Sequence, residues 1–283
     1  MAEIISGTEI SAKKRREIKE KVFKYRENGG HIGLAVIIVG DDGASKIYVR
    51  NKRRACEEVG IESFEYALSE NTSESELLEL ISKLNSDPRV NGILCQLPLP
   101  SHINEKNVIN AIDPKKDVDA FHPINTGRIL TGDYGFLPCT PAGVIEMLKE
   151  KNIPIEGRHC VIVGRSNIVG KPLAMMFLKE NATVTVCHSK TKDLKAETLR
   201  ADILVAATGK AHLITADMVK SGAVVIDVGI NRDENGKLCG DVLFSDVEKK
   251  ASYITPVPGG VGPMTITMLL ENTVKAYEMT NYT

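Results

Sequence analysis

The stretch CVIVGRSNIVGKP at residues 160–172 decides how the second half of this chain is expected to fold. An apolar run leads into Gly164, and Gly170 opens a segment that favours a helix. Glycine permits a tight bend between strand and helix, and the free amides at the start of the helix can receive phosphate. The spacing is Gly-Arg-Ser-x-x-x-Gly rather than Gly-x-Gly-x-x-Gly, so its position between a strand and a helix carries the argument. The stretch therefore predicts the phosphate-binding turn of a Rossmann-type domain.

Strands and helices are expected to alternate on both sides of this turn. Apolar runs bounded by turn residues predict strands at 33–40, 62–68, 90–97, 159–164, 182–187, 202–206 and 223–228. Helical periodicity and capping signals predict helices at 9–28, 44–59, 74–86, 104–112, 141–152, 169–180, 193–200, 215–220 and 264–280. This order indicates an α/β protein with parallel sheets, and a chain of 283 residues is expected to form two domains.

Two stretches interrupt the pattern. Residues 98–141 are rich in Pro, Gly, Asp and His and are expected to be mostly irregular, which is often a sign of function. The segment TPVPGGVGPMT at 255–265 holds three prolines and three glycines, so it cannot continue a helix or a central strand.

The end of the expected strand at 182–187 bears on the choice of cofactor. In a Rossmann-type unit this strand usually ends in an acid that binds the ribose hydroxyls of NAD. Here the sequence continues HSKT, and no acid occurs before Asp193. Arg165 and Ser189 can donate hydrogen bonds to a 2′-phosphate that an acid would repel. The pattern favours NADP over NAD, the alternative being that Arg165 and Lys190 are solvated loop charges.

A lysine interrupts the apolar face of the helix expected at 44–59. Helical spacing places five residues on this face: Ala44, Tyr48, Lys52, Ala55 and Val59. Burial disfavours the charged form of lysine and lowers its pKa, so Lys52 could act as a general base near neutral pH. The alternative is a lysine that lays its stem on the core and extends its ammonium to water.

Polar residues follow the strand expected at 90–97. Gln96 stands at its carboxyl end, where side chains of open α/β sheets line ligand crevices, although an exposed edge amide is an equal alternative. Asp117, Asp119 and His122 cluster in DVDAFHP. A metal site is a weak interpretation of one short loop, and turn-forming aspartates are the plainer one.

Composition limits the classes of function. The net charge of −1 and the 42% apolar content argue against a nucleic-acid binder, because no clustered basic excess occurs beyond the short run at 52–54. The six cysteines form no CxxC pair and several lie in apolar runs, which indicates a reducing compartment. Neither a signal peptide nor an apolar run long enough to span a bilayer is found, so a cytoplasmic protein without membrane partners is expected.

Six motifs occur in one order along nearly the whole chain: YVRNK at 48–52, GILCQLPLP at 92–100, PKKDVDAFHPINTGRI at 114–129, PCTPAGV at 138–144, GRSNIVGKP at 164–172 and TPVPGGVGPMT at 255–265. Together they resemble the bifunctional methylenetetrahydrofolate dehydrogenase/methenyltetrahydrofolate cyclohydrolases. An unrelated Rossmann dehydrogenase of the shikimate type would not explain PGGVGPMT.

The resemblance implies an activity and an architecture. Such an enzyme oxidises 5,10-methylene-tetrahydrofolate by hydride transfer to NADP and then hydrolyses the methenyl cation to 10-formyl-tetrahydrofolate. It implies a homodimer with no resident metal. It also implies a three-layer α/β catalytic domain at 1–139, completed by a returning C-terminal helix at 266–283, and a Rossmann domain at 140–265.

The resemblance also assigns roles to residues that match its motifs. Tyr48 would stack on the pterin region, Lys52 would assist water attack, and Gln96 would hold Lys52. Asp119 and the turn Pro258-Gly259-Gly260 would bind the folate. The residues implied for the cofactor are Gly164, Arg165, Ser166, Ile168, Gly170, Ser189, Gly209, Ile230 and Thr265.

One position departs from the family pattern. The family usually has DVDGF where this chain has Ala120. If that position needs a positive φ, alanine costs about 1 kcal/mol or shifts the Asp119 loop. The alternatives to a bifunctional enzyme are a dehydrogenase without effective hydrolysis and a non-catalytic NADP-binding protein, and both predict loss of Tyr48, Lys52 or Gln96.

Overall fold

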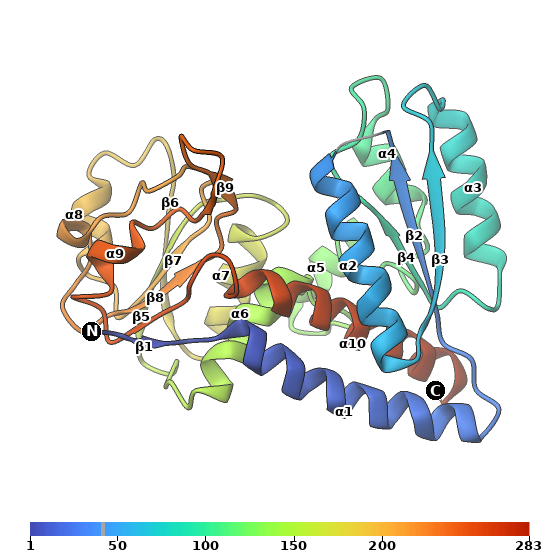
Figure 1. Cartoon of the computed structure of the whole chain (residues 1–283), viewed down its shortest axis with the longest axis horizontal. Helices are drawn as coiled ribbons and strands as arrows, with labels where there is room; N and C mark the ends of the chain where they lie inside the picture. Colours follow the sequence, from blue (N-terminus) through green and yellow to red (C-terminus); the bar gives the residue numbers. More distant parts are fainter. Residues whose placement is uncertain (41–42, 283) are drawn as a thin grey trace. The chain divides into compact units, whose positions relative to one another are not determined.

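The computed structural model describes residues 1–40 and 43–282, with the side chains of 43–48 left outside the description. The chain divides into two compact units (Figure 1). One unit consists of residues 13–139 and 266–283, and the other of residues 1–12 and 140–265. The chain passes between them within the helices α1 (Gly7–Glu27), α6 (Cys139–Glu150) and α10 (Val261–Asn281).

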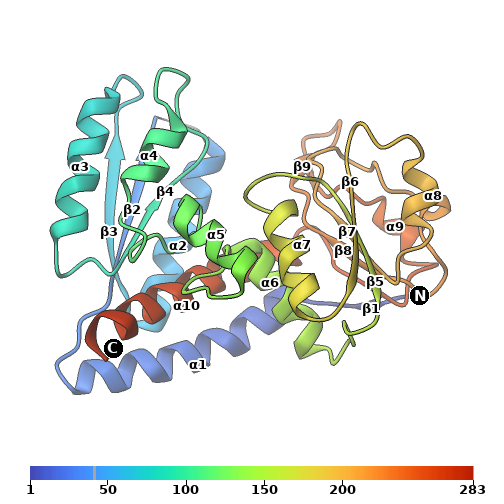
Figure 2. The same cartoon turned by 180° about the vertical axis from the view of Figure 1, so that it is seen from behind.

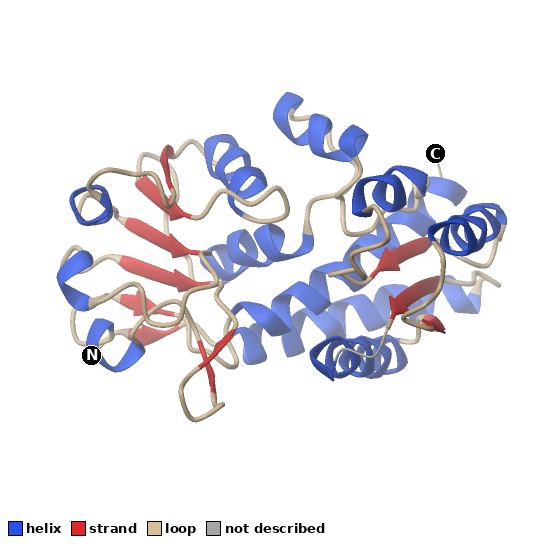
Figure 3. Ribbon diagram, turned by 90° about the horizontal axis from the view of Figure 1, so that it is seen from above, coloured by secondary structure: helices blue, strands red, loops and turns tan. Residues whose placement is uncertain are grey.

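The first unit is built on a parallel sheet of order β3-β2-β4. Its strands are β2 (Gly33–Val39), β3 (Glu62–Leu68) and β4 (Gly92–Cys95). Every residue of β2 is buried, as expected for a central strand covered on both faces. Residues of β2 and β4 form one core with α3 (Glu74–Ser86) and α4 (Glu105–Ala111). The helix α2 (Gly43–Val59) covers the other face, which completes three layers (Figures 1 and 3).

The second unit holds a six-stranded parallel sheet of order β1-β11-β8-β7-β5-β6. Figure 3 shows strands of this sheet side by side. Its strands are β1 (Glu3–Ile4), β5 (His159–Val163), β6 (Thr183–Cys187), β7 (Ile203–Ala206), β8 (Val224–Asp227) and β11 (Tyr253–Ile254). The helix α7 (Gly170–Lys179) packs on β5 and β6 (Figure 2). Because β6 and β7 flank β5 on opposite sides, the strand order reverses beside β5, and such a switch point is where nucleotides bind.

Shorter elements complete this unit. They are α8 (Leu194–Thr198), the 3₁₀ helix η1 (Ala216–Met218), the hairpin of β9 (Asn231–Arg232) and β10 (Leu238–Cys239), and α9 (Phe244–Val247). The predicted fold class, two α/β units with parallel sheets and a Rossmann-type half, is confirmed by this architecture. All six cysteines are buried and free, and no helix in the described part of the chain is long and apolar enough to span a membrane.

Three details differ from the sequence-based expectations. Residues 1–12, which we expected in the first domain, join the second unit because β1 pairs in parallel with β11. The irregular stretch at 98–141 contains a further helix, α5 (Pro123–Thr131), with His122 Nδ1 accepting from Ile124 N at its start. The final helix begins at Val261 rather than 264, since proline is tolerated in the first turn of a helix, where no N–H group takes part in an intrahelical hydrogen bond.

Candidate functional site

Lys52 is held inside the first unit. Its side chain is only 8% exposed, and its Nζ donates a hydrogen bond of 2.7 Å to Gln96 Oε1. Its neighbours on α2, Ala55 and Val59, are buried as the apolar face predicts. The alternative of a lysine extending to water is therefore wrong. Burial lowers the pKa of the Lys52 ammonium, and the negative charge of Asp119 opposes this shift.

Gln96 follows the last residue of β4, and hydrogen bonds fix both its backbone and its side-chain amide. Its backbone N–H donates to Ile37 O at 2.8 Å, which continues the sheet pairing by one residue. Its Nε2 donates to Leu97 O at 2.7 Å, so its Oε1 is left to face Lys52. The structure therefore favours a Gln96 that lines a ligand crevice over a free edge amide. Gln96 in turn fixes the position of the Lys52 nitrogen.

Asp119 lies near Lys52 on the loop that follows β4 and α4. It is half-buried, and this burial raises the pKa of its carboxyl while the Lys52 charge lowers it. The loop is organised by Asp117, which is 3% exposed and accepts from Phe121 N, His122 N and Asn125 Nδ2. Asp117 is thus a turn-forming aspartate, and within the described residues no His, Cys, Asp or Glu group fit to hold a metal ion is found.

Ala120 adopts a φ of +58°, so the condition for strain at this position is met. The residue is 1% exposed, and its backbone N–H donates to Asp117 O. An alanine therefore occupies the left-handed region directly after Asp119, where glycine would fit without strain.

Two residues that sequence reasoning missed support the same loop. Cys139, 2% exposed at the start of α6, hydrogen-bonds Val118 O and the Asp119 carboxyl. Asn272, 7% exposed on α10, donates to Val118 O and Leu137 O at 2.8 and 2.9 Å. An amide within the apolar face of the terminal helix was the available signal for Asn272, and the signal for Cys139 was its place in the PCTPAGV motif at 138–144, to which no role was assigned.

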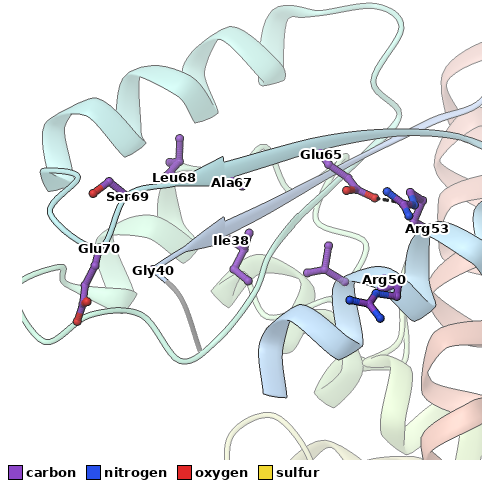
Figure 4. Close-up of a pocket in the computed structure, with 10 residues that line it drawn as sticks. Ile38, Gly40, Arg50, Arg53, Glu65, Ala67, Leu68, Ser69 and Glu70 are labelled. Carbon is purple, nitrogen blue, oxygen red and sulfur yellow. Dashed lines mark ion pairs between the residues drawn. The ribbon is translucent and has the colours of Figure 1, made fainter. Parts of the chain in front are cut away.

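Tyr48 belongs to the helix α2, but its side chain is outside the described part of the structure. A cavity of about 690 Å³ borders the same helix (Figure 4). Its wall includes Ile38, Arg50, Arg53 and Glu65, with Arg53 paired to Glu65, and Lys52 is not part of it. Asp117 and Asp119 line a separate, small cavity of about 20 Å³.

In the second unit, the loop after β5 is closely packed. Gly164 has a φ of +135°, and a Cβ there would lie 2.1 Å from Ala207 O. A Cβ on Gly170 would lie 2.1 Å from Gly164 O. Ser166 Oγ accepts from Val169 N and Gly170 N at 3.1 and 3.4 Å, at the start of α7. Both glycines are thus required by the tight turn that the sequence predicted.

Basic and hydroxyl side chains surround the end of β6. Gly164 N donates to Cys187 O, which brings the first loop beside the residues that follow β6. Arg165 and Ser189 are exposed, as are Ser166 and Ile168, and no acid stands between Cys187 and Asp193. These residues fit a nucleotide that carries a 2′-phosphate, because cationic and hydroxyl donors stand in the loops after β5 and β6, where NAD enzymes have an acid.

The other expected cofactor residues lie toward β7, β8 and the start of α10. Gly209 has a φ of +67°, and a Cβ there would meet no atom within 4 Å. Ile230 follows β8 and is 51% exposed. Thr265 Oγ1 lies 3.0 Å from Thr140 Oγ1.

The turn Pro258-Gly259-Gly260 belongs to the second unit, whereas Lys52, Gln96 and Asp119 belong to the first. Gly259 has a φ of +98°, and its carbonyl accepts from Thr8 N at 3.0 Å. A Cβ on Gly260 would lie 2.4 Å from Pro256 O. The turn requires glycine for its own backbone packing, whatever it binds.

Comparison with known families identifies this arrangement. Residues 5–119 match the catalytic domain of tetrahydrofolate dehydrogenase/cyclohydrolase, and residues 138–281 match the NAD(P)-binding domain of the same family. The chain belongs to the tetrahydrofolate dehydrogenase/cyclohydrolase family. Lys52 lies within the match to the catalytic domain, and the turn at 258–260 lies within the match to the NAD(P)-binding domain.

Curated relatives of this chain have high sequence identity over nearly its whole length. The chain is 60% identical over 278 residues to the "Bifunctional protein FolD" of Acetivibrio thermocellus, with 98% of each chain covered. It is 61% identical over 276 residues to the protein of the same name from Agathobacter rectalis, covering 98% and 99%.

Solved structures of the family have the same fold. The FolD enzyme of Campylobacter jejuni matches with a TM-score of 0.97 and 54% identity, covering 99% of this chain and 100% of that one. The Trypanosoma brucei enzyme, complexed with NADP cofactor and inhibitor, matches with a TM-score of 0.95 and 36% identity, covering 100% and 99%. A shikimate dehydrogenase from Thermus thermophilus shares the fold alone, at 17% identity and a TM-score of 0.54.

Proposed function

We propose that this chain oxidises 5,10-methylene-tetrahydrofolate to the 5,10-methenyl cation with NADP and then hydrolyses the cation to 10-formyl-tetrahydrofolate. The observation that carries the proposal is the buried Lys52, hydrogen-bonded to Gln96 beside Asp119, in a chain whose other unit holds a nucleotide turn without an acid. Membership of the tetrahydrofolate dehydrogenase/cyclohydrolase family supports both steps.

In the oxidation, the cofactor supplies the acceptor for a hydride from the one-carbon bridge. This step needs orientation more than an acid or a base, so the protein contributes positioning. Arg165, Ser166 and Ser189 would hold the 2′-phosphate, with Ile168 beside them. The glycines 164 and 170 let the backbone approach the pyrophosphate, and Gly209, Ile230 and Thr265 would border the nicotinamide.

In the hydrolysis, Lys52 would handle the proton of the attacking water. The oxygen of water bonds to the cationic carbon, and one proton passes to the neutral amine of Lys52. The bond from that carbon to one ring nitrogen then breaks, and the nitrogen takes up the proton from the Lys52 ammonium. The hydroxyl on the carbon becomes the formyl carbonyl as it releases its proton to solvent, so one proton is released overall. A group that is neutral suits this step because a permanent cation would be repelled by the substrate, and burial lowers the pKa of Lys52 in that direction.

Gln96 and Asp119 would support this chemistry from fixed positions. Gln96 Oε1 accepts one N–H of Lys52, which leaves the lone pair of the neutral amine free for the water proton. Asp119 would accept hydrogen bonds from the amino and ring N–H groups of the pterin. Tyr48 would stack on the pterin, and the Pro258–Gly260 turn would lie against the folate.

A spectrophotometric assay with 5,10-methylene-tetrahydrofolate tests the proposal, with NADP and NAD compared and the NADPH and methenyl absorbances followed separately. Formation of NADPH without lasting methenyl accumulation is expected. Accumulation of the methenyl compound would favour a dehydrogenase without effective hydrolysis. Absence of any NADP-dependent signal would favour a non-catalytic NADP-binding protein.

We also infer that the protein acts as a cytoplasmic homodimer with folate, and not nucleic acid, as its partner. The family resemblance supports the dimer, and the buried free cysteines support a reducing compartment. Sedimentation equilibrium of the purified protein tests the oligomeric state, and a monomer at micromolar concentration would contradict the dimer.

A further inference from the structure

A buried carboxylate organises the edge of the second sheet where β7 and β8 end. Asp241 has no exposed surface. Its Oδ2 accepts from Thr208 N and Gly209 N, and its Oδ1 accepts from Lys210 N at 3.0 Å and Asn231 Nδ2 at 2.9 Å. A carboxylate has about four lone-pair positions, so these four donors occupy its full accepting capacity. Three successive backbone N–H groups of one loop are therefore turned inward onto a single side chain.

The backbone around Asp241 is shaped to hold that side chain. A Cβ on Gly229 would lie 2.2 Å from Asp241 Oδ1, so only glycine fits there. A second buried carboxylate, Asp227 at the end of β8, accepts from Asp241 N at 3.0 Å and from Gly229 N at 2.9 Å. Asp241 is consequently fixed by β8 and in turn fixes the loop that follows β7.

The loop Thr208–Lys210, which follows β7, lies on the side of β5 opposite to β6. Ala207 O approaches the Cα of Gly164 so closely that a Cβ there would clash at 2.1 Å, so the loops after β5 and β7 touch. The β6 side of a Rossmann-type sheet binds the adenosine half of a dinucleotide, which leaves the β7–β8 side for the other half. On that side, Gly209 offers open space beside its backbone, and Ile230 presents an exposed apolar side chain.

We propose that Asp241 is a positioning residue for the nicotinamide half of the cofactor, acting through the loop Thr208–Lys210 and through Asn231. The proposal rests on the function proposed above, since it assumes that a dinucleotide binds at this edge. Asp241 itself touches neither substrate nor cofactor. It holds Gly209 and, through Asn231, the adjoining Ile230 at the separation that the nicotinamide requires.

The variant Asp241→Asn tests this role because it is nearly isosteric. Either orientation of the new amide sets its NH₂ group against two of the four donors, so two hydrogen bonds are lost. Calorimetric titration with NADP should show a dissociation constant raised about tenfold or more. Titration with 2′,5′-ADP, which has the phosphate-bearing adenosine half and no nicotinamide, should give an unchanged constant.

Kinetics provide a second readout. The kcat of NADP-dependent oxidation should fall along with cofactor affinity, because the nicotinamide is misplaced. Hydrolysis of methenyl-tetrahydrofolate supplied directly needs no cofactor and should keep its wild-type rate. Asn231→Ala removes one of the four donors and should show the same pattern more weakly, which keeps the test available if Asp241→Asn does not fold.

Asp202→Asn is the matched control. Asp202 also accepts a backbone hydrogen bond, from His159 N, and pairs with Lys220, but it lies at the amino end of the same sheet. This variant should bind NADP and 2′,5′-ADP like the wild type.

Three results would overturn the inference. If the wild-type protein binds no NADP, the proposed function itself fails, and this role fails with it. If wild-type binding is normal and both Asp241→Asn and Asn231→Ala match it, Asp241 has no positioning role. If Asp241→Asn weakens NADP and 2′,5′-ADP equally, the carboxylate serves general stability rather than the nicotinamide end.

Discussion

Replacing Lys52 with methionine should abolish hydrolysis of methenyl-tetrahydrofolate while leaving the fold and NADP binding intact. General acid–base groups typically contribute 10²–10⁴-fold to a rate, which is roughly 3–6 kcal/mol of the barrier at about 1.4 kcal/mol per tenfold. We therefore expect Lys52→Met to lose at least about 100-fold in hydrolysis. NADP binding should not change, because the residues expected to bind NADP belong to the other unit.

The cost of this substitution in stability is expected to be small. Methionine fills a similar volume at a site where the lysine is 8% exposed. The change removes a buried polar amine, which is favourable, and deprives Gln96 Oε1 of its donor, which costs up to about 1–3 kcal/mol. Gln96 is half-buried, so water can replace part of that bond, and the two effects should cancel within about 2 kcal/mol.

The pH dependence of hydrolysis tests whether Lys52 acts in its neutral form. Burial lowers the pKa of Lys52, so its neutral form becomes more abundant as pH rises through a value below that of free lysine. Wild-type hydrolysis should therefore rise along this limb, and the limb should be missing in Lys52→Met. Lys116→Met is the matched control, since burial also lowers the pKa of Lys116, whose ammonium donates to Leu84 O and Asp87 O.

The assay follows the loss of methenyl absorbance, with the uncatalysed rate in the same buffer subtracted. Urea unfolding and NADP titration of both variants separate chemistry from stability. Hydrolysis by Lys52→Met within about threefold of wild type would refute the role of Lys52, since such a change is far below the contribution of a general base.

Three further predictions concern other features. Ser189→Glu should raise the KM for NADP about tenfold or more and change that for NAD little, because a carboxylate repels the 2′-phosphate; equal effects on both cofactors in steady-state assays would contradict this site. Ser73→Ala removes the capping box at the start of α3 and should lower the free energy of unfolding by about 1 kcal/mol in urea titration; no change would show that water caps the helix equally well. Ala120→Gly relieves about 1–2 kcal/mol of left-handed strain, but it also removes a buried methyl group and raises the conformational entropy of the unfolded chain. The free energy of unfolding should therefore change by less than about 1 kcal/mol, and a larger gain in the same titration would mean that the loop is more strained than its φ indicates.

Elements with strong local signals could be predicted from sequence. The helix at 74–86 was predicted at its observed bounds because Ser73 and Glu76 form both halves of a capping box. The strands β2 and β5 were predicted within one residue because apolar runs end at glycine. The helix α5 was missed although His122 and Pro123 at its start and Gly132 at its end are recognisable signals, because the surrounding composition favoured a loop.

The candidate site was predictable only where a local sequence signal marks it. Helical spacing, a local property, predicted that Lys52 lies on the apolar face of its helix, but it left open whether the ammonium extends to water, and only the structure shows that Lys52 is buried. Its hydrogen bond to Gln96 joins residues 44 positions apart, and only the family resemblance supplied that pairing before the structure. Asp241 was missed because its donors lie 10 to 33 positions away and no spacing rule relates them.

The pairing of β1 with β11 has a consequence for the order in which the chain can acquire its structure. Glu3 and Ile4 pair with Tyr253 and Ile254, so the earlier segment waits for a partner that is translated only after the rest of both units up to that point. The other unit also needs residues 266–283 for completion. Each unit therefore needs a segment that is translated after most of the other unit, and the usual vectorial route, in which one domain folds before the next is translated, is closed to these two units.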